Sequence, residues 1–299
     1  MKHLYIIGNG FDLFSGLKTS YRDFSEWLKK HYAFVYEAFE SAYDIQNIEW
    51  WNDFEVSLGK LDIKRYVIQN TPPPKSFDEI CKEIQEKRAN EEKLSTLPPS
   101  LHKESPSADR LEGLFDIVHY CLRKWILSMT SVNNPKYIQL EKQNSVFLNF
   151  NYTKTLEGFY NISKDQILYI HGSAYDSDKL IFGHNSFADG EAYRYDGEKV
   201  AFVLERYHKN PYEFIYKNIE FFEKIKDVET IHILGLSFSP VDIDYLDWIY
   251  KHTTSGVKWE VSWYSEEDSK RIDEFIQSHR NLVRNLEKIQ LAPIKAKYV

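Results

Sequence analysis

The sequence predicts an α/β fold in which a largely parallel β-sheet is flanked by helices. Two observations carry this prediction: short apolar runs alternate with stretches of helical periodicity, and several of the runs end at a glycine. Buried parallel strands typically read as continuous apolar runs. The expected strands are residues 3–7, 145–150, 167–171, 179–182, 230–234 and 257–264, and the last of these alternates in polarity, as a strand nearer the sheet edge does.

The expected helices carry apolar residues three or four positions apart, on one face. They are residues 21–43, 111–129, 211–225, 240–252 and 266–279. Ser20 and Asp23 form a capping pair for the first helix. Ser239 and Pro240 are expected to begin the fourth helix, with proline at its favoured first position.

We expect one α/β domain over residues 1–299, with a helical and partly Pro-rich insertion at about 45–135, after the first βα unit. Residues 69–110 hold six of the ten prolines, which flank a charged helical stretch at 77–93. This composition favours a solvated insertion, and a lid or partner-contact element is the functional alternative.

Composition limits the classes of function. Lys and Arg number 38 and Asp and Glu 45, a formal charge of −7, which argues against a nucleic-acid-binding protein. The two cysteines, Cys81 and Cys121, cannot build a disulfide framework or a cysteine-based zinc site. No apolar stretch approaches a membrane span or a signal peptide. We expect a cytoplasmic protein with no membrane partner and no bound metal.

Glycines at the ends of predicted strands indicate a ligand crevice. Gly8, Gly172, Gly183 and Gly235 each follow an apolar run. In open α/β sheets the ligand lies beyond the carboxyl ends of the strands, where glycine allows close approach of the backbone. The four positions therefore predict one shared crevice.

The first motif of this crevice is GNGFD, from Gly8 to Asp12. Leu13 stands where a full dinucleotide fingerprint needs glycine. The turn formed by Gly8, Asn9 and Gly10 can still direct backbone N–H groups at a pyrophosphate, or it can be an ordinary tight turn. Asp12 either caps a short helix or contacts ribose hydroxyls.

Asparagine and histidine follow two other strands. Asn151, in NFNYT, either forms a turn or orients a water or ribose hydroxyl, because an amide is not a useful base. His171, in IHGS with Gly172, is the best catalytic residue by position, because histidine titrates near neutral pH. His184, in FGHN, is the next candidate after His171, or it forms a structural hydrogen bond beside Asn185, and both residues are expected to contact the ligand.

The strand end at Gly235 carries another motif of the crevice, and a separate motif stands apart from it at residues 50–55. In GLSFSPVDIDYL, Gly235 ends a strand and Ser237 can bind phosphate, ribose or base, although Asp242 and Asp244 would repel a close anion. WWNDFE, residues 50–55, is expected to open a helix; its tryptophans are expected in the core, and Glu55 is a reserve acid or base.

Together, IIGNGFDLFSGLKTSY, WNDFE, FNYTKTLE, IHG with FGHN, and GLSFSPVDIDYL resemble the AbiH family of bacteriophage abortive-infection proteins, in that family's order. The chain is more distantly similar to the sirtuin-like NAD-binding superfamily. That resemblance implies a Rossmann-like crevice that binds NAD, with Asn151 and His171 at the catalytic centre and Gly8, Asn9, Gly10 and Ser237 around the dinucleotide. The missing four-cysteine zinc ribbon makes hydrolysis the expected reaction rather than deacylation.

The resemblance implies an anti-phage protein that hydrolyses NAD at the nicotinamide–ribose bond, with His171 as general base. A nucleotide is the expected ligand, and a second copy of the chain or a phage-derived trigger is the partner that fits this role. The sequence leaves open a non-catalytic nucleotide sensor or partner-binding module. A nuclease built on Asp12, Asp242 and Asp244 is disfavoured by the acidic charge.

Overall fold

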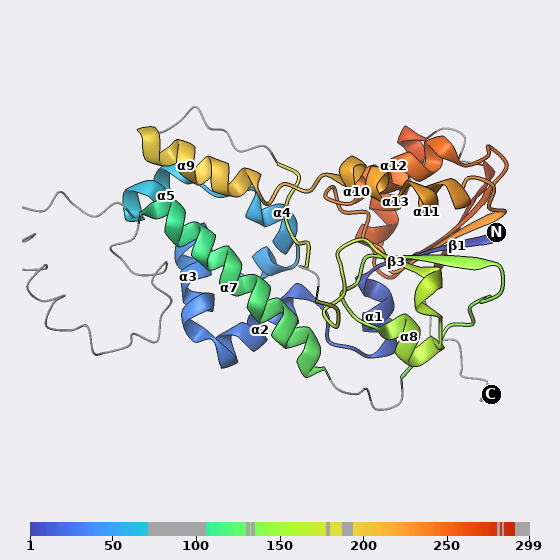
Figure 1. Cartoon of the computed structure of the whole chain (residues 1–299), viewed down its shortest axis with the longest axis horizontal. Coiled ribbons are helices and arrows are strands. Elements are labelled where there is room, and N and C mark those ends of the chain that lie inside the picture. Colours follow the sequence, from blue (N-terminus) through green and yellow to red (C-terminus); the bar gives the residue numbers. More distant parts are fainter. Residues whose placement is uncertain are drawn as a thin grey trace, which may run out of the picture.

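A six-stranded, all-parallel sheet forms one half of the molecule, and a body of helices forms the other (Figure 1). The computed structural model describes residues 1–70, 106–129, 132, 135–177, 180–186, 194–279, 282 and 284–290. The strand order is β3-β2-β1-β4-β5-β6, which is the Rossmann order. The strands are β1 (His3–Ile7), β2 (Ser145–Asn149), β3 (Ile167–Tyr169), β4 (Thr230–Leu234), β5 (Lys258–Trp263) and β6 (Leu286–Gln290). The predicted α/β, Rossmann-like fold is confirmed.

The central strand shows why the sheet is covered on both faces. Successive side chains of a strand point to opposite faces. Leu4 and Ile6 of β1 pack in one apolar cluster, and Tyr5 and Ile7 pack in another. One face is covered by α10 (Pro211–Lys217), α11 (Ile219–Lys224), α12 (Ile243–His252) and α13 (Glu266–Ser278); α1 (Asn9–Ser15) and α8 (Thr155–Tyr160) lie on the other (Figure 1).

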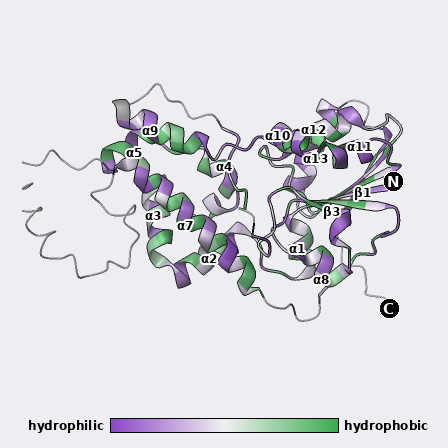
Figure 2. Cartoon of the chain, viewed as in Figure 1, coloured by the Kyte–Doolittle hydropathy of each residue, from purple (hydrophilic) through white to green (hydrophobic). Residues whose placement is uncertain are grey.

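The helical body has its own apolar core. Figure 2 shows apolar stripes along its helices, and Trp51 and Phe115 are fully buried between them. Its elements are α2 (Tyr21–His31), α3 (Ala33–Tyr43), the 3-10 helix η1 (Ile48–Trp51), α4 (Phe54–Leu58), α5 (Ile63–Asn70), α7 (Ser107–Ser128) and α9 (Arg194–Glu205). This body therefore includes helices before and after the 45–135 range, while the charged stretch at 77–93 lies outside the described residues.

Several predicted elements differ in the structure. The helix expected at 21–43 is broken at Tyr32, which adopts φ −143° and ψ 57°. The helix expected from Pro240 begins at Ile243. Residues 180–182 are not a strand, because Leu180 and Phe182 pack into the helical body; Lys179 lies outside the described residues. A short 3-10 helix, η3 (Lys164–Gln166), precedes β3.

The carboxyl ends of the strands face the helical body. The N-terminus lies at the outer end of β1, so the parallel strands run inward and their carboxyl ends face the helices (Figure 1). Among the described residues, none of the helices combines the length and apolar character required to cross a lipid bilayer.

Candidate functional site

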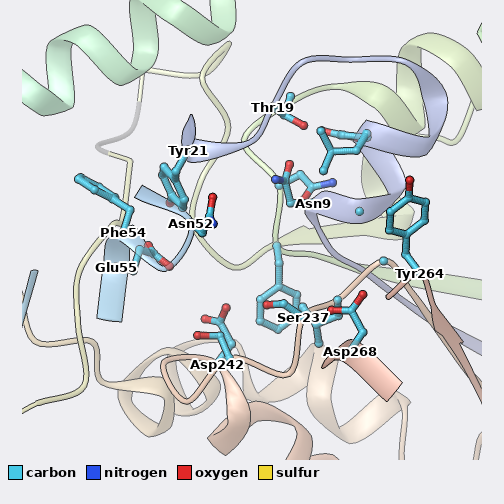
Figure 3. Close-up of a pocket in the computed structure, with 18 of the residues that line it drawn as sticks. Asn9, Thr19, Tyr21, Asn52, Phe54, Glu55, Ser237, Asp242, Tyr264 and Asp268 are labelled. Carbon is cyan, nitrogen blue, oxygen red and sulfur yellow. The ribbon is translucent and has the colours of Figure 1, made fainter. Parts of the chain in front are cut away.

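A cavity of about 920 Å³ lies at the carboxyl ends of the strands, between the sheet and the helical body. It is lined by the β1–α1 turn, by the segment after β2 and by the loop after β4. In this strand order the chain reverses direction across the sheet between β1 and β4, which is where ligands of Rossmann-type sheets bind. Figure 3 shows Asn9 and Ser237 from these two loops facing the same space.

The glycines of the two loops contact each other. A Cβ on Gly10 would lie 2.9 Å from the Cα of Gly235, and a Cβ on Gly235 would lie 2.1 Å from the backbone nitrogen of Phe11. The amides of Gly8 and Gly10 donate to the carbonyls of Leu234 and Gly235. These two N–H groups are therefore engaged within the fold, as in an ordinary tight turn.

A buried charged cluster lies beside the cavity. Nζ of Lys209 is 2.9 Å from Oε2 of Glu55 and 3.4 Å from Oδ1 of Asp242. The same Asp242 oxygen is 3.2 Å from Nε2 of His171, and Nζ of Lys209 is 3.3 Å from that same nitrogen. The four residues come from four separate segments: α4, the turn after β3, the connection after α9 and the start of α12. We call these four residues the buried charged cluster.

Mutual attraction keeps the lysine and the aspartate of this cluster charged. Burial alone would favour the neutral forms. Desolvation would lower the pKa of Lys209, but Asp242 and Glu55 hold it above its usual value. Desolvation would likewise raise the pKa of Asp242, but Lys209 and His171 lower it to about 2. Both side chains are thus ionised at neutral pH.

Asp12 lies in a second buried group that also lines the cavity. Its Oδ2 accepts a hydrogen bond from the hydroxyl of Thr153, while its Oδ1 has no partner among the described residues. Desolvation raises the pKa of Asp12 to about 6, and the neighbouring polar side chains of Thr153, Thr155 and Asn151 act against this rise. Nδ2 of Asn151 donates to the carbonyl oxygen of Gly8, 3.0 Å away, so this amide also holds the β1–α1 turn.

The structure brings together most of the residues singled out from the sequence. Those that line the cavity are Asn9, Gly10, Asp12, Asn151, His171, Gly235 and Ser237. Four others are not in its lining: Gly8, Gly172, His184 and Asn185. Nε2 of the buried His184 is 3.1 Å from the carbonyl of Leu204, and Asn185 donates to the carbonyl of Pro240 rather than to His184.

Two members of the buried charged cluster are not identified by sequence reasoning as partners of His171. Asp242 is expected as a helix-terminal charge and as a member of the disfavoured nuclease cluster, and Lys209 is not expected at all. Lys209 stands alone in YHKNPYE, a context without a motif, so the sequence carries no signal for it. Glu55, the reserve acid or base, does reach the cluster.

The lining of the cavity is predominantly acidic. Its acidic residues are Asp12, Glu49, Asp53, Glu55, Asp242, Glu267 and Asp268, and its lysine and arginine residues are Lys136 and Arg271. Arg271 contacts Glu267 at 2.8 Å and Asp53 at 3.7 Å. Within the described ranges, no group of three or more His, Cys, Asp or Glu side chains is arranged to hold a metal ion.

Comparison with known families decides where the chain belongs. The family model for bacteriophage abortive infection AbiH matches residues 4–263. The chain belongs to the AbiH family. The match spans the sheet through β5, the helical body and all four members of the buried charged cluster. AbiH membership supports a role in abortive infection of bacteriophage. A search of curated proteins found no match to this chain.

Proposed function

We propose that this AbiH protein defends bacteria against phage by hydrolysing NAD at its nicotinamide–ribose bond. The observation that carries the proposal is the pairing of His171 with the ionised Asp242 beside a cavity at the switch point of a Rossmann-ordered sheet. A carboxylate that accepts from one imidazole nitrogen fixes the tautomer and leaves the other nitrogen basic.

His171 fits the role of general base. Nε2 of His171 lies 3.2 Å from Oδ1 of Asp242 and 3.3 Å from Nζ of Lys209. We assign the Nε2 proton to Asp242, which is acceptor-only, and the Lys209 protons to the two carboxylates of the cluster. Nδ1 then carries the lone pair, and it has no hydrogen-bond partner among the described residues. In the proposed step, Nδ1 takes a proton from water as the water oxygen bonds to the ribose C1′. The C1′–N bond breaks, its electrons pass to the pyridinium nitrogen, and nicotinamide leaves as a neutral molecule.

The electrostatics of the cavity suit this reaction. The nicotinamide ring of NAD is cationic, and its cleavage passes through an oxocarbenium-like state, which nearby carboxylates stabilise. Because the Gly10 amide is engaged by Gly235, the phosphates are assigned to Arg271 and Lys136, the basic lining residues. Asn151 is assigned to orient the water or a ribose hydroxyl through the part of its amide that does not bind Gly8.

The test uses bacteria infected with a phage against which the protein protects. We expect cellular NAD to fall and nicotinamide to rise after infection in cells with the wild-type protein. With His171→Ala, NAD should remain at its uninfected level and protection should be lost. A Glu213→Gln variant, changed at an exposed pair on α10, is the matched control and should behave as wild type. Protection with unchanged NAD would refute the proposal.

A non-catalytic nucleotide sensor is the second proposal, and one observation favours it. Asn151 and His171 both bind other parts of the protein, through Gly8 and Asp242, and so hold the fold together. The sensor predicts protection with intact NAD, and a nucleotide recovered unchanged from the purified protein. The infection experiment therefore separates the two proposals.

A further inference from the structure

The buried charged cluster carries an excess negative charge. Glu55 and Asp242 contribute two carboxylates and Lys209 contributes one ammonium. His171 adds no charge in the general-base role assigned to it under the proposed function. One negative charge is therefore not balanced within the cluster. An unbalanced charge in a site shielded from water is unfavourable unless a ligand or solvent compensates it.

The cluster also leaves two hydrogen-bond acceptors unused. Oε2 of Glu55 binds Lys209, but Oε1 is buried and has no partner among the described residues. The same is true of Nδ1 of His171. Both residues line the cavity. Buried polar atoms are nearly always paired in native proteins, so two unpaired acceptors at one cavity indicate a ligand that donates hydrogen bonds.

The walls around these acceptors are aromatic. Tyr21, Phe54, Phe150 and Tyr152 line the same cavity. The Tyr21 and Phe54 rings lie 4.8 Å apart, and the Phe150 ring meets the His171 ring edge-on at 5.6 Å. Figure 3 shows Tyr21, Phe54 and Glu55 on one side of the cavity, with Asp242 below Glu55. Aromatic faces favour flat rings, and they attract cations.

We propose that this end of the cavity is a subsite for a planar aromatic cation with an N–H donor, and that Glu55 is the residue that selects for its positive charge. A pyridinium carboxamide has both properties. The identification of the ring as the nicotinamide of NAD rests on the proposed function. Glu55 belongs to α4, so the helical body supplies the selecting charge and the sheet supplies His171.

The test compares two small probes of almost equal shape: 1-methylnicotinamide, which is cationic, and nicotinamide, which is neutral. Neither has a ribose bond to cleave, so binding is measured without hydrolysis, by ligand-observed NMR titration. We expect the wild-type protein to bind the cation at least about tenfold more tightly, because the charge meets Glu55 in a partly desolvated site. Equal binding of the two probes would overturn the proposal.

Variants assign the preference to Glu55. Glu55→Gln keeps the size of the side chain and should reduce the preference to about twofold or less, by removal of one charge. Glu49→Gln makes the same change at an exposed residue of the cavity rim, where solvent screens the charge, and should keep the wild-type preference. Glu55→Asp keeps the carboxylate and should prefer the cation more strongly than Glu55→Gln does. If Glu55→Gln does not fold, Glu55→Asp still tests whether the carboxylate carries the preference. A wild-type preference in Glu55→Gln, or its loss in Glu55→Asp, would contradict the role of Glu55.

The two proposals fail in different ways. A preference for the cation that depends on Glu55, without nicotinamide release in infected cells, supports the subsite and refutes hydrolysis. Nicotinamide release without such a preference refutes the subsite and leaves hydrolysis in place.

Discussion

Replacing Lys209 with methionine removes the ammonium that separates two buried carboxylates. Lys209 is 2.9 Å from Glu55 and 3.4 Å from Asp242, and its side chain is only 4% exposed. Loss of one partner from a buried ion pair typically costs about 3–5 kcal/mol of unfolding free energy. The lowering of the pKa of Asp242 from 3.8 to about 2 corresponds to about 2–3 kcal/mol for its attractive contacts net of burial, a figure of similar order. We expect a loss of about 3–5 kcal/mol at pH 7.

The stability difference between the Lys209→Met variant and the wild type should depend on pH in a defined direction. In the wild type the folded pKa of Asp242 lies below its unfolded value, so its stabilising contribution is present above pH 3.8 and is lost as the pH falls toward about 2. Without Lys209 the desolvation dominates and raises the folded pKa of Asp242. The variant then gains stability as the pH falls through that raised value. The difference between the two proteins should be largest at pH 7 and should shrink toward pH 4.

Urea denaturation followed by tryptophan fluorescence, at several pH values between 4 and 7, measures both effects. Lys217→Met is the control, since Lys217 pairs with Glu213 on the surface and should change stability by less than about 0.5 kcal/mol. A loss below about 1 kcal/mol at pH 7, or a loss that does not vary with pH, would refute the electrostatic account of the cluster.

Three other predictions concern single positions. Asp12→Asn should raise stability at pH 7.5 but not at pH 4, and thermal melts at both pH values test this. The pKa of Asp12 in the folded protein is raised to about 6, so in the wild type its ionisation costs stability as the pH rises through that value. Gly235→Ala should lower the melting temperature sharply, because the residue has φ +68° and its Cβ would lie 2.1 Å from the nitrogen of Phe11. The control Gly158→Ala has open space around its Cβ in α8 and should raise the melting temperature slightly. Equal melting temperatures of the two variants would contradict the close contact of the two loops. Cys121 is buried, and burial raises its pKa to about 12. In the folded Cys81→Ser variant it should not react with iodoacetamide at pH 8, and in urea it should react. Rapid labelling without urea would contradict its burial.

The sequence predicts the centre of the sheet better than its edges. The strand at 3–7 is confirmed because its residues are apolar on both faces, as a central parallel strand requires. β6 is missed because LEKIQ is charged and half exposed, with little apolar pattern. The apolar residues of 180–182 are buried, but against helices, and periodicity does not distinguish the two kinds of burial.

The sequence likewise predicts some residues of the candidate site and misses others. Asp12 and His171 lie at strand ends marked by glycine and Asn151 lies at the end of another strand, so the local sequence is sufficient to bring them to one cavity. Their catalytic and binding roles stay predictions. Lys209 and Asp242 become partners only because the connection after α9 meets the start of α12, and this tertiary information is not present in any short window of sequence.

The order of synthesis gives the buried charged cluster a further consequence. Glu55 leaves the ribosome first, His171 and Lys209 follow, and Asp242 comes last of the four. A chain interrupted before residue 242 contains the histidine but not the carboxylate that pairs with it. Under the proposed function, truncated products would therefore lack the arrangement that activates His171. If the proposed function holds, a cell would thereby be protected from unfinished copies of the protein.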